Sequence, residues 1–290
     1  MGNNQNIQWY PGHMTKTKRQ IQSSLKLIDL VVEILDARIP VSSRNPDLQN
    51  IIQDKPKLVL LNKCDKASKK GTDAWIKYYA DNNIVALPVD CKSGKGLNQF
   101  APAVRKILSA KYNALKDKGI VNPVLRVMIV GIPNVGKSSF INKIGKQIKA
   151  KVEDRPGVTR GNQWYTIEKD LEMLDTPGIL WPKFDDERVG QHLAFTGAIK
   201  DNILDIELLA VDLLESFKKD TPIEFLERFK ITKDILDKND GYELLQIIGR
   251  KRGMVISGGE IDTLRASTML LDEYRNGKFG KITLEFPEDL

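Results

Sequence analysis

The sequence predicts an α/β fold in which a mostly parallel sheet of six strands is followed by a small all-α domain. Four apolar runs rich in Val, Ile and Leu each end in a polar loop, and they occupy 29–36, 57–62, 84–90 and 124–131. Such runs are typical of strands buried on both faces of a parallel sheet. Helix-length segments separate the runs, as the crossover connections between parallel strands require.

The remaining two predicted strands form a hairpin. Residues 163–168 and 171–175 are separated only by Lys169 and Asp170. A connection of two residues joins antiparallel neighbours and is too short for a crossover. We therefore expect this hairpin to add one antiparallel strand to the sheet.

Helical patterns replace the strand-like runs after about residue 184. Thr221 and Asp240 are predicted to cap helices, and 260–277 has the spacing of an amphipathic helix. The only strand candidate in this part of the chain is 281–286. The change in pattern predicts two domains, residues 1–182 with a basic N-terminal extension at 1–28, and residues 183–290.

The composition indicates a packed protein with a preference for anionic partners. Of the 290 residues, 41% are hydrophobic and 29% are charged, which excludes a disordered chain, and the net charge is +7. Two cysteines are too few for a disulfide framework. No apolar run approaches the length of a membrane span, and the N-terminus lacks a secretory signal. We expect a cytoplasmic monomer that does not bind membranes.

A phosphate-binding loop is the clearest chemical motif. Residues 131–138 read GIPNVGKS, which follows a predicted strand and precedes a helix-like segment. The glycines allow backbone N–H groups to surround phosphates, Lys137 supplies a charge, and Ser138 offers a hydroxyl to Mg²⁺. The nucleotide-binding residues expected from this loop are Asn134, Val135, Gly136, Lys137, Ser138 and Ser139. A glycine-rich turn without a ligand is the alternative.

Two further segments have the character of nucleotide-sensing switches. Asp175-Thr-Pro-Gly178 ends a predicted strand, so Asp175 can hold Mg²⁺ through water and the Gly178 N–H can meet a γ-phosphate. Between this segment and the phosphate loop, Thr159 lies in PGVTR, where a loop threonine can close over Mg²⁺ and the γ-phosphate. Any loop threonine can also be idle.

The segment NKCD at 62–65 has the chemistry needed to recognise guanine. The Asp65 carboxylate can accept the two N–H donors of guanine, a pattern that adenine lacks. Asn62 can bond the base and brace neighbouring loops, and the stem of Lys63 can lie over the ring. After the next strand, Cys91 and Lys92 lie in a loop suited to donate a backbone N–H to guanine O6. The alternative, an ATP-binding P-loop protein, would require that Asp65 has no role in base recognition.

The base-reading segments precede the phosphate loop, the reverse of the usual order. In a parallel sheet, all loops at the carboxyl edge face one crevice, so a circular permutation of the chain preserves the site. The chain resembles circularly permuted P-loop GTPases of the ribosome biogenesis GTPase A (YlqF) family. The segments that carry this resemblance are WYPGHM (9–14), DARIP (36–40), NKCD, DCKSG (90–94), GIPNVGKS, PGVTR and DTPGIL.

The resemblance implies GTP hydrolysis coupled to late assembly of the large (50S) ribosomal subunit, with ribosomal RNA bound by the C-terminal helical domain. It implies a catalytic role for His13, whose alternatives are a structural or RNA-contact role. Ile179 stands where many GTPases have a water-orienting glutamine, so we expect stimulation by the ribosome. In related GTPases the equivalent of Asn134 helps to hold K⁺, whereas a loop-bracing asparagine is the alternative.

Basic residues at both ends of the chain are candidates for RNA contact. They are Lys16, Lys18, Arg19, Arg250, Lys251, Arg252, Arg265 and Arg275. Solvated surface is the other interpretation of each cluster. A different class of function also remains open, a nucleotide-gated RNA-binding assembly clamp whose hydrolysis is incidental. GTP and GDP, Mg²⁺ and the large subunit are the expected ligands and partner in either case.

Overall fold

The computed structural model describes residues 14–52, 55–148, 151–153, 163–178, 180, 184, 186–219 and 221–290. These fall into two compact units, one that contains the sheet together with residues 285–290, and one that contains residues 184–284. The strands are β1 (Leu30–Asp36), β2 (Lys57–Asn62), β3 (Val85–Pro88), β4 (Leu125–Val130), β5 (Lys151–Glu153), β6 (Gln163–Glu168) and β7 (Leu171–Asp175).

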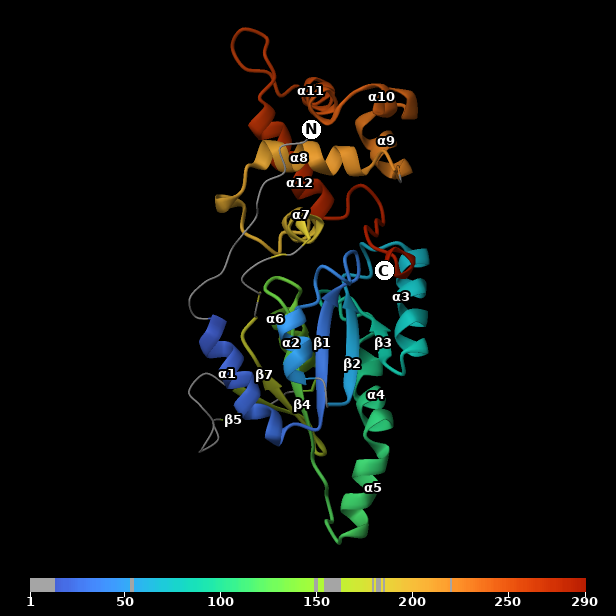
Figure 1. Cartoon of the computed structure of the whole chain (residues 1–290), viewed down its shortest axis with the longest axis vertical. Helices are drawn as coiled ribbons and strands as arrows, with labels where there is room; N and C mark the ends of the chain where they lie inside the picture. The colour runs from blue at the N-terminus through green and yellow to red at the C-terminus, as the bar shows by residue number, and fades with distance from the viewer. Residues whose placement is uncertain are drawn as a thin grey trace. The chain divides into compact units, whose positions relative to one another are not determined.

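Helices surround the sheet and build the second unit (Figure 1). In the sheet unit they are α1 (Met14–Ser24), η1 (Leu25–Leu27), α2 (Pro46–Ile52), α3 (Lys69–Asp81), η2 (Leu97–Gln99), α4 (Phe100–Ile107), α5 (Ser109–Asp117), α6 (Lys137–Ile148) and η4 (Pro287–Asp289). In the second unit they are α7 (Glu187–Phe195), η3 (Asp201–Ile203), α8 (Ile206–Ser216), α9 (Ile223–Phe229), α10 (Lys233–Lys238), α11 (Gly241–Lys251) and α12 (Thr263–Arg275). None of the described helices is long and apolar enough to cross a membrane.

The sheet has the strand order β3-β2-β1-β4-β7-β6-β5. The first five strands in this order, β3 to β7, are parallel to one another. Strand β6 runs antiparallel to both of its neighbours, β7 and β5. All six predicted strands are therefore present. The three-residue edge strand β5 is an addition that the prediction of six strands lacked. β1 is buried along its whole length, which explains its continuous apolar run.

The order of the strands locates the site. The chain passes from β1 to β2 and β3 in one direction, and then returns to β4 on the other side of β1. Ligands of open α/β sheets bind outside the carboxyl ends of the strands, where the strand order reverses. The crevice is thus expected beside Asp36 at the end of β1 and Val130 at the end of β4.

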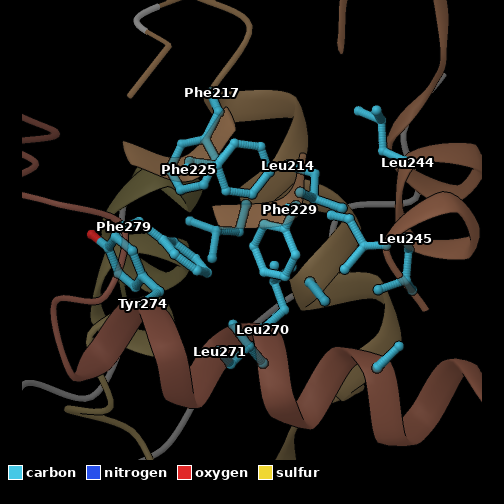
Figure 2. Close-up of a cluster of buried hydrophobic side chains, with 14 of the residues drawn as sticks. Leu214, Phe217, Phe225, Phe229, Leu244, Leu245, Leu270, Leu271, Tyr274 and Phe279 are labelled. Atoms are coloured by element: carbon cyan, nitrogen blue, oxygen red, sulfur yellow. The ribbon is translucent and has the colours of Figure 1, made fainter. Parts of the chain in front are cut away.

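The helical unit has its own aromatic core. Figure 2 shows the rings of Phe217, Phe225, Phe229 and Phe279 gathered near Tyr274. The centroids of Phe217 and Phe225 lie 5.0 Å apart in an edge-to-face arrangement, and those of Phe225 and Phe279 lie 5.3 Å apart. These rings are all buried, so the unit stabilises itself by apolar packing.

Some helix boundaries follow the sequence and others do not. Asp240 caps α11, as predicted, and also forms a reciprocal capping box with Glu243. Thr221 does not cap α9, because its hydroxyl donates to Phe217 O at 2.8 Å and Pro222 is the N-cap instead. The strand expected at 281–286 is also wrong, because these residues belong to no helix or strand.

Candidate functional site

The predicted motifs meet at the carboxyl edge of the parallel strands. NKCD follows β2, DCKSG follows β3, the phosphate loop follows β4, and DTPG follows β7. Because these strands are parallel neighbours on either side of β1, their terminal loops lie at one edge. The inverted order of the motifs along the chain does not separate them in space.

Asn62 joins three of these loops. Its side chain is 3% exposed, its Nδ2 donates to Val135 O at 2.5 Å, and its Oδ1 accepts the Cys91 N–H at 3.0 Å. A buried amide is costly unless its groups are paired, and here both ends are used. The bracing role predicted for Asn62 is therefore confirmed. The Cys91 N–H is occupied by this bond, whereas the sequence predicted only that some N–H of this loop reaches guanine O6.

The phosphate loop fits closely around this brace. Gly136 has φ of +108°, and a Cβ there would lie 2.2 Å from Asn62 Nδ2. Gly131 has φ of +155°, with a Cβ position 2.7 Å from Ile34 O. Both glycines are required by backbone conformation and by space, which is why the motif needs them. Asn134 also has a positive φ, 60°, and is exposed on the same loop.

Lys137 begins α6 beneath the loop. Its Nζ donates to Gly131 O at 3.1 Å and Ile132 O at 3.0 Å. Burial lowers the pKa of Lys137 to about 8, although the nearby Asp175 carboxylate opposes the shift. Ser138 and Ser139 follow in the first turn and are exposed. Free N–H groups at such a helix start suit an anionic ligand.

The switch segment after β7 lies against the same loop. Asp175 pairs in register with Ile129 of β4, and the Thr176 hydroxyl donates to Ile129 O at 2.6 Å. Burial raises the pKa of Asp175, with Lys137 acting in the opposite direction. A Cβ on Gly178 would lie 2.7 Å from Lys137 Nζ. Asp175 and Gly178 therefore lie next to Lys137, the residue predicted to bind the terminal phosphates.

The residues predicted to read guanine lie on the other side of β1. Lys63 has φ of 60°, and its Nζ lies 2.9 Å from Asp36 Oδ2. Asp65 and Lys92 are exposed in adjacent loops. Cys91 is buried, and burial raises the pKa of its thiol to about 12, so it is an inert packing residue.

Asp36 is a member of the site that the motifs did not reveal. It is 2% exposed, and it binds Arg38 as well as Lys63. Burial raises the pKa of Asp36, but the charges and hydrogen bonds of Arg38 and Lys63 outweigh burial and hold it well below its usual value. The only signal in the sequence was the position of DARIP at the end of the first strand.

Three predicted residues lie outside the described parts of the chain. They are His13, Thr159 and Ile179. Among the basic residues, Arg19, Arg250, Lys251, Arg252 and Arg265 are exposed. Lys18 pairs with Asp47 at 3.2 Å, and Lys16 lies in α1. Arg275 binds Asp201 and two main-chain carbonyls, so its guanidinium stabilises the helical unit.

Comparison with known proteins identifies the family. A family described as 50S ribosome-binding GTPase matches residues 126–240. Ribosome biogenesis GTPase A of Bacillus cereus is 46% identical to this chain, over 98% of the chain and 95% of its own length. The chain belongs to the ribosome biogenesis GTPase A family. It is accordingly a GTP-binding protein and a GTP hydrolase.

Solved structures of this family agree with the fold. The GDP-bound YlqF is 28% identical with a TM-score of 0.67, and covers 93% of this chain and all of its own. The GNP-bound YlqF from T. maritima, also 28% identical, covers 95% of this chain and all of its own with a TM-score of 0.64. The sheet is thus the permuted P-loop GTPase sheet that the motif order predicted.

Proposed function

We propose that this GTPase couples GTP hydrolysis to late assembly of the large ribosomal subunit. The observation that carries the proposal is the Asn62 brace, which unites a base-reading loop and a phosphate loop in one crevice. The matched family description, 50S ribosome-binding GTPase, and the names of the relatives support the large subunit as the partner.

Guanine is read by the loops after β2 and β3. The exposed Asp65 carboxylate accepts the N1–H and N2–H donors of the base, and the Lys63 stem lies along the ring. With the Cys91 N–H committed to Asn62, the exposed loop around Lys92 supplies the donor for O6. Residues 134–139 hold the phosphates through the main chain and Lys137.

Mg²⁺ is held beside the phosphates. Hydroxyl and carboxylate oxygens are its preferred ligands, and the exposed Ser138 follows Lys137, whose charge acts on the half-buried Asp175 carboxylate. Thr159 is the third proposed ligand. Bound there, the ion would neutralise charge that develops on the phosphates during hydrolysis. Asn134, which is exposed on the loop, is proposed to help hold K⁺ there.

His13 is proposed as the catalytic residue that takes the place of the missing glutamine. Ile179 has no group that can orient water, so another side chain must supply this function. Two histidines occur in the sequence, and His192 lies within α7 of the helical unit, where it contacts the Phe195 ring. Stimulation by the ribosome follows if binding completes the site.

Residues 1–182 are proposed as the GTP-binding domain and residues 183–290 as the RNA-binding domain. Arg250, Lys251, Arg252 and Arg265 give the helical unit an exposed basic surface. Lys16, Lys18 and Arg19 of the N-terminal extension, which belong to the sheet unit, are proposed as further RNA contacts. Arg275, predicted to bind RNA, is better assigned to the internal bonds described above.

A nucleotide-gated clamp with incidental hydrolysis is the alternative function, which Ile179 favours. GTP turnover measured with and without purified large subunits, in K⁺ and in Na⁺, separates the two. A coupled GTPase turns over faster with the subunit and faster in K⁺. Turnover that the subunit leaves unchanged, with nucleotide-dependent RNA binding intact, supports the clamp.

A further inference from the structure

The end of the chain is built into the nucleotide-binding unit. Residues 285–290 belong to the sheet unit, although the residues immediately before them belong to the helical unit. Trp75 Nε1 of α3 donates to Glu285 O at 2.8 Å, and Lys70 Nζ lies 5.6 Å from the centroid of the Phe286 ring. These contacts fix the tail against the helix that follows the NKCD loop.

The side chain of Glu285 is hydrogen-bonded to the loop after β1. Its carboxylate accepts the Val41 N–H at 2.6 Å and the Ser42 N–H at 3.0 Å, and it also accepts the Ser42 hydroxyl. Glu285 is 8% exposed and Ser42 is 1% exposed. A carboxylate this deeply buried is tolerated because donors surround it. The same bonds hold two successive N–H groups of the loop in place.

The same loop, which follows β1, is hydrogen-bonded to Asp36. The next residue, Ser43, is fully buried, and its hydroxyl accepts the Asp36 N–H at 3.0 Å and donates to Ile39 O at 2.7 Å. The Asp36 carboxylate binds Lys63 Nζ at 2.9 Å. A continuous chain of bonded groups therefore runs from the tail to the second residue of NKCD.

Main-chain bonds reinforce this connection at the end of β1. The Ala37 N–H donates to Asn62 O at 2.8 Å. The start of the loop after β1 is therefore hydrogen-bonded to Asn62, the residue that links three loops of the site. The Arg38 guanidinium binds both oxygens of Asp36, at 3.0 and 2.8 Å. A displacement of the loop would move groups that position both Asn62 and Lys63.

We propose that Glu285 and Asp36 are positioning residues for guanine recognition, and that the C-terminal tail thereby sets the selectivity of the site. This proposal rests on the proposed base-reading role of the NKCD loop. Both carboxylates are buried and bonded to other groups of the protein. Each acts through Lys63 and Asn62, so its loss should affect base recognition more than phosphate binding.

The test compares Glu285→Ala with the matched control Glu288→Ala, an exposed glutamate in the same tail. Affinities for GDP and for IDP, which lacks the 2-amino group, are measured by calorimetry on the full chain. We expect Glu285→Ala to weaken GDP binding by about tenfold. The preference for GDP over IDP should fall with it, whereas Glu288→Ala should match the wild type.

Thermal unfolding identifies variants that are folded at the assay temperature. If Glu285→Ala is unfolded at that temperature, Glu285→Gln is used instead, because the amide keeps one acceptor oxygen but loses the charge. Glu285→Gln should lose part of the preference for GDP over IDP. Equal weakening of GDP and IDP, or unchanged binding of both, would overturn the proposal. Asp65→Asn tests the base-reading assignment separately. A loss of GDP preference in Asp65→Asn but not in a folded Glu285 variant refutes the tail's role alone.

Discussion

Asn62 Nδ2 lies 2.5 Å from Val135 O, across the end of β1, and so links the loop after β2 to the phosphate loop after β4. The two residues are 73 positions apart in the sequence. The Asn62 side-chain amide thus fixes the distance between the loop predicted to read the base and the phosphate loop. The base and the phosphates of a bound nucleotide must be separated by a matching distance.

Replacing Asn62 should weaken both nucleotide binding and stability. Asn62→Ala leaves Val135 O and the Cys91 N–H without their buried partner, which costs about 1–3 kcal/mol of unfolding free energy. GDP affinity should fall by on the order of 100-fold because three loops lose their common brace. Calorimetry and denaturant unfolding measure the two effects, with the exposed Asn98→Ala as the control. Wild-type affinity in a folded Asn62→Ala protein would refute the brace.

The phosphate loop should not tolerate a methyl group at Gly136. The Cβ of Gly136→Ala would lie 2.2 Å from Asn62 Nδ2, so the loop or the brace must move. We expect nucleotide binding to be lost in calorimetry. Gly119→Ala is the matched control, because φ is also positive at +85° but the added Cβ meets nothing within 4 Å. If both variants bind GDP alike, the close approach to Asn62 is not required.

The Asp36 carboxylate should make stability depend on acid pH. Its pKa in the folded protein lies below the value of 3.8 expected for the unfolded chain, because Arg38 and Lys63 outweigh burial. The stabilisation is therefore complete above about pH 5 and is lost as the pH falls through 3.8 and below. The difference in unfolding free energy between wild type and Asp36→Asn should shrink from pH 6 to pH 3, when denaturant unfolding is followed across that range. The exposed Asp81→Asn is measured alongside as a control. A difference between wild type and Asp36→Asn that stays constant over this range would contradict the charge pairing.

His13 should matter for stimulated hydrolysis and not for binding. His13→Ala should keep its GTP affinity while its turnover on large subunits falls by about 100-fold, the scale of a lost acid–base group. His192→Ala, the other histidine, is the control. Equal stimulated rates in the two variants would exclude a catalytic role for His13.

The sequence was most informative where chemistry is local. The phosphate loop and NKCD were found because their residue types and spacing are fixed by the ligand. Strands β1, β2 and β4 were found because burial on both faces demands apolar runs. β5 was missed because three residues carry too little pattern. Residues 281–286 alternate in polarity like a strand. The structure instead buries Ile282, Thr283 and Glu285 and leaves Leu284 and Phe286 partly exposed, and none of the described strands pairs with this segment.

Contacts distant in the sequence were the ones that could not be predicted. Glu285 and Ser42 are 243 residues apart, and no motif connects them. Thr221 looked like a cap, yet its hydroxyl bonds back to the preceding helix at Phe217 O. The role of Cys91 also depended on tertiary geometry, because only the fold shows that its N–H is used by Asn62.

The base-reading role of Asp65 is tested most directly by exchanging the ligand and the residue together. Asp65→Asn replaces a carboxylate that accepts two guanine N–H donors with an amide that can donate to the 2-carbonyl of xanthine. We expect GDP affinity to fall by at least about 100-fold and XDP affinity to rise, as measured by calorimetry with both nucleotides. An Asp65→Asn protein that still binds GDP as the wild type does, and XDP no better, would contradict the guanine site.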